Sequence, residues 1–346
     1  FNMANKKIAI VGAGIFGCSI ALELDKKNFH TVLFEKEQDI MLLASKNNHN
    51  RIHYGYHYPR SLDTTIQSLR GYNSFKEYYG DSLVSGFRNY YAIAKEGSYI
   101  SSEFYKEFCD KAGISYESSY PDEYLLNSNL VSDCFLTEEP VYDWESLQNI
   151  IKHKISKSKI DLRISTDYIK SNEEFDFVIN CSYSNINKIS EFHNVKGLSF
   201  RKQDIIIPIF KSKMERIGLT VMDGPFCSIL PKGKELNKFL LYHAKYSIVE
   251  ETLNSDLKLN SNINSSINII LEKSKIFYPF LKNVDIIDYW RTSRVIPITK
   301  DDARVSEIIT YKNNPKFISV FSGKVSTAIL IAKQISVGLK QENFNI

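Results

Sequence analysis

Cysteine is scarce in this sequence, and its spacing excludes the commonest cysteine-based sites. The five cysteines are scattered over 346 residues, and no two form a C-x-x-C pair. Structural zinc sites and dithiol redox centres need closely spaced ligands, so neither is expected. An odd number of thiols in mostly apolar contexts is typical of a reduced protein of the cytoplasm. We therefore expect a cytoplasmic location and no metal centre; the cysteines are Cys18, Cys109, Cys134, Cys181 and Cys227.

Long apolar runs and an excess of one charge are also missing. No stretch of about 18 uninterrupted apolar residues occurs, so no membrane span is expected. The 44 basic and 40 acidic residues nearly balance at a net charge of +4, and no cluster of lysine and arginine stands out. Nucleic acid is therefore not an expected partner. Neither a Walker loop nor a nucleophile elbow occurs, so the chemistry of this globular chain must lie in another motif.

Such a motif lies near the start of the sequence. Residues 7–11 are apolar after the first, Lys7, and rich in β-branched side chains, which predicts a strand buried on both faces. The pattern G-x-G-x-x-G follows at once, and a helix-forming stretch comes after it. In such a unit Gly12 permits the tight turn, Gly14 lets the backbone approach a pyrophosphate, and Gly17 lets the helix pack closely on the strand.

An acidic residue completes this dinucleotide-binding signature. Residues 31–34 predict a second strand, and Glu35 ends it at the expected distance. Its carboxylate would accept hydrogen bonds from the ribose hydroxyls of an adenosine, with Lys36 beside it. The diphosphate would lie on the first N–H groups of the helix, those of Ile15 and Phe16. We expect a dinucleotide here, and this stretch alone does not choose between FAD and NAD.

Further landmarks give the sequence a resemblance to the D-amino-acid oxidase/glycine oxidase superfamily of FAD-dependent oxidoreductases. The resemblance covers nearly the whole chain and rests on landmarks in the expected order. Besides the front unit, residues 137–164 contain an acidic turn, a helix and a strand, and residues 176–182 contain a strand that ends in a small-residue turn. Residues 289–297 contain an arginine-bearing strand, and residues 319–327 contain the closing strand, glycine and helix. The His- and Tyr-rich segment 48–61 most resembles that of L-2-hydroxyglutarate oxidases.

The resemblance implies an α/β fold (α+β overall) with two domains. A Rossmann-like FAD-binding domain of the glutathione-reductase type would be built from both chain ends, and a mostly antiparallel β-sheet substrate domain would be inserted into it. The strand-rich stretch 200–248 agrees with such an insertion. The predicted FAD-binding domain comprises residues 3–80, 140–197 and 290–346, and the predicted substrate domain comprises residues 81–139 and 198–289.

FAD is the cofactor that the resemblance implies. The closing helix N-terminus would face the flavin pyrimidine, where negative charge develops on reduction. The segment 48–61 would pass the flavin ring. The further cofactor-binding residues carried over in this way are Asn48, Arg51, Ile52, Cys181, Ser182, Gly323, Lys324, Val325, Ser326 and Thr327. At residues 293–295 and at Gly323 the chain departs from the family, which often carries more glycines there.

Two residues are predicted to act in catalysis. His53 would be a general base, since a histidine pKa lies near neutral pH, and attachment of flavin to this histidine is an alternative role. Arg294 would bind a substrate carboxylate through two parallel hydrogen bonds. Each of these side chains also has a purely structural interpretation, as a hydrogen-bonded histidine or a salt-bridged arginine. The residues predicted to contact substrate are Tyr54, Tyr56, Arg60, Tyr242, Arg291 and Arg294.

The expected function is oxidation of a C–N or C–O bond in a small polar substrate that carries a carboxylate, by an FAD-dependent oxidoreductase that passes electrons to O2 or another acceptor. An NAD-dependent dehydrogenase and a flavin-binding protein without redox turnover are the alternatives. The sequence leaves the substrate, including a sugar intermediate or a modified tRNA base, and the oligomeric state open.

Overall fold

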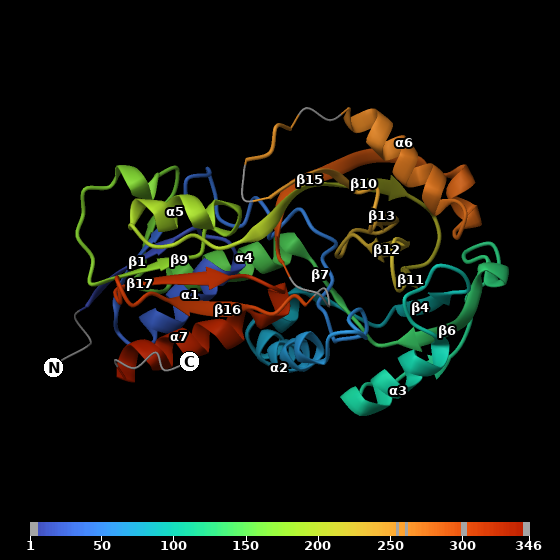
Figure 1. Cartoon of the computed structure of the whole chain (residues 1–346), viewed down its shortest axis with the longest axis horizontal. Helices are drawn as coiled ribbons and strands as arrows, with labels where there is room; N and C mark the ends of the chain where they lie inside the picture. The colour runs from blue at the N-terminus through green and yellow to red at the C-terminus, as the bar shows by residue number, and fades with distance from the viewer. Residues whose placement is uncertain (1–5, 254–255, 260–261, 299–302, 342–346) are drawn as a thin grey trace.

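The computed structural model describes residues 6–253, 256–259, 262–298 and 303–341, which form two sheets that lie side by side (Figure 1). The first sheet combines strands from near both ends of the described chain with two strands from residues 161–180. The second is built from the middle of the chain. Among the described residues, no helix combines the length and the apolar character that a membrane crossing requires.

The first sheet has six strands in the order β16-β17-β9-β1-β2-β8, and its neighbours are parallel except β16 and β17. Strand β1 is buried on both faces, with Ile8 and Ile10 in one core cluster and Ala9 and Val11 in another. This explains its unbroken apolar sequence. The strands are β1 Lys7–Val11, β2 His30–Phe34, β8 Asp161–Arg163, β9 Phe177–Asn180, β16 Glu307–Thr310 and β17 Phe317–Phe321.

Helices cover both faces of this sheet. In Figure 1, α5 lies above it and α1 and α7 lie below it, where their apolar residues join the cluster of Ile8 and Ile10. Asp143 caps α4, because its Oδ1 accepts the N–H of Ser146 at 2.8 Å. The helices of this half are α1 Ile15–Asp25, α2 Leu62–Tyr79, α4 Trp144–Ser156, α5 Ile186–Phe192 and α7 Ala328–Gln341.

The second sheet has nine strands and is antiparallel except where β11 pairs with β4. Its longest pairing joins β10 to β15 and sets Gln203 opposite Arg294. Helices α3 Ser102–Ala112 and α6 Ile263–Ser274 flank it (Figure 1). The strands are β4 Arg88–Ala94, β5 Glu117–Ser118, β6 Val131–Thr137, β10 Phe200–Lys211, β11 Ile217–Met222, β12 Cys227–Pro231, β13 Lys238–His243, β14 Ile248–Leu253 and β15 Asp285–Pro297.

A two-stranded ribbon connects the halves, with β3 Leu83–Val84 paired to β7 Val141–Tyr142. The predicted fold class, a mixed α/β fold with a Rossmann-like sheet and an antiparallel sheet, is confirmed. The division into two domains stays a prediction. Its boundary at residue 290 falls inside β15, which pairs with β10 along nearly its whole length, and its limits at residues 3 and 346 lie outside the described residues.

Candidate active site

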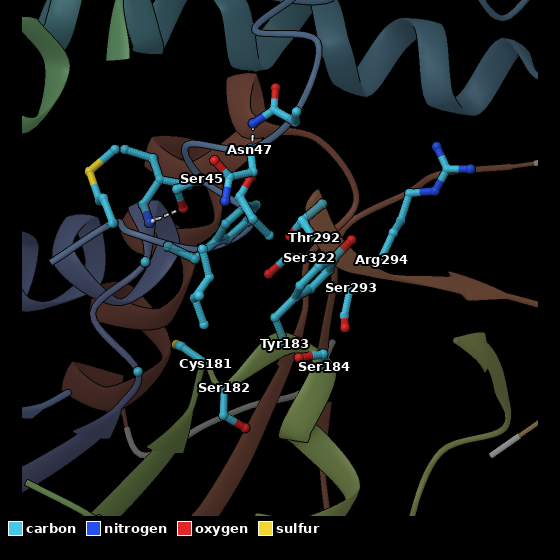
Figure 2. A pocket seen from close by; sticks show the side chains of 18 of the residues that line it. Ser45, Asn47, Cys181, Ser182, Tyr183, Ser184, Thr292, Ser293, Arg294 and Ser322 are labelled. Carbon is cyan, nitrogen blue, oxygen red and sulfur yellow. Dashed lines mark hydrogen bonds between the residues drawn. The ribbon is translucent and has the colours of Figure 1, made fainter. Parts of the chain in front are cut away.

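A cavity of about 600 Å³ lies at the carboxyl ends of four parallel strands, where Gly12, Glu35, Cys181 and Ser322 follow β1, β2, β9 and β17. Ligands of doubly wound sheets bind at this edge. Figure 2 shows Ser45 and Cys181 on one side of the cavity and Thr292, Ser293 and Arg294 of β15 on the other. The two sheets therefore both contribute walls to it.

The three glycines of the front motif have different steric roles. Gly12 has φ +100°, and a Cβ there would lie 2.8 Å from the carbonyl oxygen of Cys181. A Cβ on Gly17 would lie 1.9 Å from the carbonyl oxygen of Gly12, so only glycine lets α1 approach β1. Gly14 instead lines the cavity, and the nearest atom to a Cβ there is Ser45 Oγ at 3.2 Å.

The acid at the end of β2 is held in place by the backbone. Glu35 Oε2 accepts the N–H of Ala13 at 2.8 Å, and its Oε1 accepts the N–H of Glu37 at 2.9 Å. Each carboxylate oxygen keeps a further lone pair, which ribose hydroxyls can use. The N–H of Ile15, expected to hold a diphosphate, donates to Ser45 Oγ at 3.0 Å. The hydroxyl of Ser45 therefore takes up the N–H group of Ile15 at the start of α1. No sequence pattern indicated this role for Ser45.

Most of the predicted site residues meet in this cavity. Two groups far apart in sequence, one from the motif at the chain start and one from the segment after β17, face the same space. The predicted residues that line it are Gly12, Gly14, Ile15, Phe16, Glu35, Lys36, Asn48, Arg51, His53, Cys181, Ser182, Tyr242, Arg291, Arg294, Gly323, Lys324 and Val325.

Several predicted contacts lie elsewhere in the described structure. Tyr54 and Tyr56 pack in the cluster around Tyr91, and the Tyr56 hydroxyl donates to the carbonyl of Ser115. Arg60 forms an ion pair with Asp223. These three residues do not line the cavity as it stands, so their contact with substrate stays a prediction. Ile52, Ser326 and Thr327 are buried without lining it, and Gly17 acts only through packing.

Two predicted ligand-binding arginines are already bound to acids. Arg291 Nε and Nη2 donate to the buried carboxylate of Asp204, at 2.6 Å for the shortest contact. Arg51 forms a fully buried ion pair with Glu139 at 2.6 Å, and its other nitrogen donates to Thr220 Oγ1 at 2.8 Å. The structural interpretation therefore fits both arginines better than direct ligand binding does.

Glu139 was not recognised as a functional residue from sequence. It is 2% exposed, and besides Arg51 it accepts the backbone N–H of Tyr54 at 2.8 Å and the hydroxyl hydrogen of Tyr91. It thereby ties the segment around His53 to the second sheet. A pair of acids directly before Pro140 was visible in the sequence, but nothing local indicated that one of them is buried.

The end of the cavity opposite Glu35 is rich in histidine and cation. His53 and His57 lie there with ring centroids 5.9 Å apart, and the Nδ1 atoms of both are buried without a hydrogen-bond partner. Burial and the positive charges of Lys324 and Arg51 hold the pKa of each histidine well below its usual value. The expectation that the pKa of His53 lies near neutral pH is therefore wrong. Both imidazoles are neutral and can accept a proton.

A third histidine in this region is structural. His49 Nε2 lies 3.1 Å from the carbonyl oxygen of Leu240, and its Nδ1 lies 3.2 Å from Ser228 Oγ. Only the tautomer protonated at Nε2 satisfies both contacts, with the serine hydroxyl donating to Nδ1. Burial, with the charge of Arg51, lowers the pKa of His49 to about 3. His49 thus forms a neutral part of the wall.

Lys324 contributes positive charge near both His53 and His57. Its ammonium nitrogen lies 4.2 Å from the ring centroid of Tyr58 and contacts the hydroxyl of that tyrosine. Burial, together with the charge of Arg51, lowers the pKa of Lys324 from 10.5 to about 7. Lys324 directly precedes the 3₁₀ turn Val325–Thr327 that leads into α7, and its side chain makes no capping hydrogen bond to that turn.

Lys324 predicts a specific pH dependence of stability. Between pH 7 and 10.5 the unfolded lysine binds a proton that the folded lysine has lost, so the free energy of unfolding should rise with pH in this window and should level off below it. Lys324→Met should flatten that rise. Urea unfolding of flavin-free protein across the window measures the effect, with the exposed Lys312→Met as control; equal slopes in all three proteins would contradict the assignment.

Arg294 lies on the opposite wall from Cys181 (Figure 2). Its Nη2 and Nε both donate to the amide oxygen of Gln203, at 2.7 and 3.1 Å, and its guanidinium carbon lies 5.7 Å from the ring centroid of Tyr242. These contacts orient the guanidinium through a neutral amide and an aromatic ring. The guanidinium therefore carries its positive charge at the wall of the cavity.

The arrangement fits FAD. The cavity is continuous from the adenosine-type acid Glu35, past the open position at Gly14, to the neutral histidines and Lys324. Only a ligand with a nucleotide at one end and a second polar group far from it would contact both Glu35 and the region of the histidines and Lys324. Fold and site thus define a dinucleotide-binding protein of the FAD-dependent type, in which FAD would be held by the motif glycines, Glu35, Cys181, Ser182 and the segment from Gly323 to Val325.

Comparison with known proteins leads to the same class. Residues 7–125 match the family model described as DAO, FAD dependent oxidoreductase. The chain is 25% identical over 230 residues to the FAD-dependent monooxygenase FPY4 of Fusarium mangiferae, in a match that covers 65% of this chain and 60% of that protein. The chain thus spans less than two thirds of the length of that relative.

Two further likenesses extend over nearly the whole chain. A 372-residue alignment with the FAD-dependent monooxygenase kojA of Aspergillus flavus is 26% identical and covers 95% of this chain and 84% of that protein. The crystal structure of glycine oxidase from Geobacillus kaustophilus has a TM-score of 0.74 at 14% identity and covers 98% of this chain and 95% of its own. The chain is therefore similar to FAD-dependent oxidoreductases over nearly its whole length, and the expectation of FAD as its cofactor is confirmed.

Proposed function

We propose that this protein oxidises a small substrate that carries a carboxylate next to an amine- or hydroxyl-bearing carbon. The observation that carries the proposal is the polarity of the far end of the cavity, where the neutral His53 and His57 stand near Lys324 and where Arg294 faces the same space. Bound FAD supplies the acceptor for the hydride that leaves such a carbon. The chain supplies orientation and proton transfer.

His53 is the proposed general base. Its imidazole is neutral, its Nδ1 has no hydrogen-bond partner, and that atom lies 4.0 Å from Glu139 Oε1. A neutral imidazole holds a lone pair that can take the proton of a substrate hydroxyl or ammonium group. Glu139 Oε1 also accepts the N–H of Tyr54, so this carboxylate holds the segment that carries His53 in place.

Arg294 is the proposed anchor for the substrate carboxylate, with Tyr242 beside it. Guanidinium groups bind carboxylates through two parallel hydrogen bonds, which fixes the orientation of the carbon next to the carboxylate. The structural likeness to glycine oxidase supports an amino acid as substrate. The resemblance of segment 48–61 to L-2-hydroxyglutarate oxidases supports a 2-hydroxy acid, and both substrate types carry the carboxylate that Arg294 would bind.

The test is flavin bleaching under anaerobic conditions. Purified protein should be yellow, and its visible absorption should fall when the correct amino acid or 2-hydroxy acid is added. Readmission of air should restore the colour and show whether hydrogen peroxide is released or oxygen enters the product, as in a monooxygenase reaction. A protein that holds flavin but never bleaches would support the alternative of binding without turnover, and a colourless protein that binds NADH would overturn the proposal.

His53→Asn should slow anaerobic bleaching by about 100-fold or more, because removal of a general base typically costs this factor. The flavin content and the melting temperature should stay unchanged, since Nδ1 of His53 makes no hydrogen bond. The exposed His30→Asn at the start of β2 is the matched control. Full bleaching rates in His53→Asn would remove this residue from the mechanism.

A further inference from the structure

A second cavity of about 370 Å³ lies behind the segment that forms one wall of the FAD cavity. It opens between the N-terminal end of α4, the hairpin between β12 and β13, and strands β10 and β15, and it shares no lining residue with the FAD cavity. We call it the tryptophan cavity. Its lining includes Lys46, Asn50, Trp144, Lys232, Lys238 and Trp290.

The cavity gathers the two tryptophans of the sequence, each beside a lysine. The ammonium of Lys46 lies 4.4 Å from the ring centroid of Trp144, and that of Lys232 lies 5.2 Å from the ring centroid of Trp290. Trp144 is fixed because its Nε1 donates to the carbonyl of Met41 at 2.9 Å. Aromatic walls with cations beside them favour a planar anionic ligand.

Some of the charged side chains that line the cavity are already engaged in ion pairs or hydrogen bonds. Glu235 bridges Lys232 and Lys238, and Asp143 is engaged as the cap of α4. Lys46 contributes positive charge that no acid in these pairs offsets. Burial, and then the charges of Lys238 and Lys46, lower the pKa of Lys232. The acids Glu145 and Asp288 are exposed, so they lie at the rim.

Asn50 adds an independent indication of a ligand. The residue is 1% exposed, and its Oδ1 is buried without a hydrogen-bond partner. Its backbone is fixed on both sides, because its N–H donates to Asn48 Oδ1 at 2.6 Å and its carbonyl accepts the N–H of Tyr142 at 2.8 Å. A buried acceptor without a partner is costly, and a ligand hydroxyl would supply the missing donor.

We propose that the tryptophan cavity is a second binding site, for a small aromatic carboxylate that also carries a hydroxyl group. The ring would lie against Trp144 or Trp290, the carboxylate would contact Lys46, and the hydroxyl would donate to Asn50 Oδ1. Segment 46–51 separates the two cavities: His49 and Arg51 line the FAD cavity, whereas Lys46 and Asn50 line this one. A ligand here therefore stabilises the wall of the FAD cavity from behind.

The probe for the test is 4-hydroxybenzoate, added to the FAD-loaded protein and followed by calorimetry and tryptophan emission. Because both tryptophans line the cavity, their emission reports its occupancy directly. We expect saturable binding at one site per chain, a change in tryptophan emission, and an unchanged visible flavin spectrum. The methyl ester of the probe, which lacks the charge, and benzoate, which lacks the hydroxyl, should each bind about tenfold more weakly.

Lys46→Met and Trp290→Leu should each weaken binding of the probe by about tenfold or more, whereas the remote Lys111→Met on α3 should leave it unchanged. Two results would overturn the proposal. One is the absence of saturable binding at millimolar probe. The other is binding that takes place elsewhere. Such binding would be unaffected by either variant, or it would shift the flavin spectrum without a change in tryptophan emission and so place the probe in the FAD cavity. Neither result would bear on the oxidation proposed above, which is measured by bleaching.

Discussion

Replacement of Glu139 by alanine should lower the free energy of unfolding by about 3–5 kcal/mol, the usual cost of leaving one member of a buried ion pair without its partner. Arg51 is 5% exposed, and its guanidinium group stays protonated in proteins, so the variant would leave a buried positive charge without its acid. The N–H of Tyr54 and the hydroxyl of Tyr91 would lose their acceptor as well.

Two further variants separate charge from shape. Glu139→Gln keeps an acceptor for Tyr54 and Tyr91 and should cost less than the alanine variant. Arg51→Met combined with Glu139→Gln removes both charges and should be more stable than either single variant. Urea unfolding of the four proteins completes the cycle. A loss below about 1 kcal/mol in Glu139→Ala would show that the pair does not hold the His53 segment in place.

Replacement of Gly14 by valine should abolish retention of FAD while the protein stays folded. The backbone at Gly14 has φ −71° and ψ −178°, an extended conformation that any residue adopts, and only Ser45 Oγ lies near the position of a Cβ. The valine methyl groups would instead enter the space in which the backbone must approach the pyrophosphate. We expect affinity for FAD to fall by about 100-fold or more, equivalent to about 2.7 kcal/mol.

Two other glycines provide controls for this result. Gly17→Ala places its Cβ 1.9 Å from the Gly12 carbonyl and should impair folding itself, which circular dichroism and expression yield would reveal. Gly80→Ala meets only Lys76 Cγ, at 3.9 Å, and should leave both folding and flavin content unchanged. Flavin absorbance after gel filtration measures retention. A yellow, stable Gly14→Val protein would contradict the location of the pyrophosphate site.

The sequence by itself determined the nucleotide half of the site. The run of residues 7–11, the three glycines and Glu35 are local in sequence, and each acts through its own backbone or its strand end, so a pattern of residue types is enough to locate them. The same holds for the cap at Asp143, whose partner Ser146 is three residues away. The fold class followed from these elements and from the matching strand, glycine and helix at the chain end.

Only the tertiary structure decided the roles of the charged side chains. Arg51, Arg60, Arg291 and Arg294 look alike in sequence, but their partners lie 88, 163, 87 and 91 residues away. Strand pairing decides whether an arginine forms an ion pair with a buried acid or faces a cavity. For Arg291 and Arg294 the register of β10 against β15 decides it. The low pKa values of His53 and Lys324 arise in the same way, from burial and from charges that folding brings together. Neither cause is encoded near the residue that it affects.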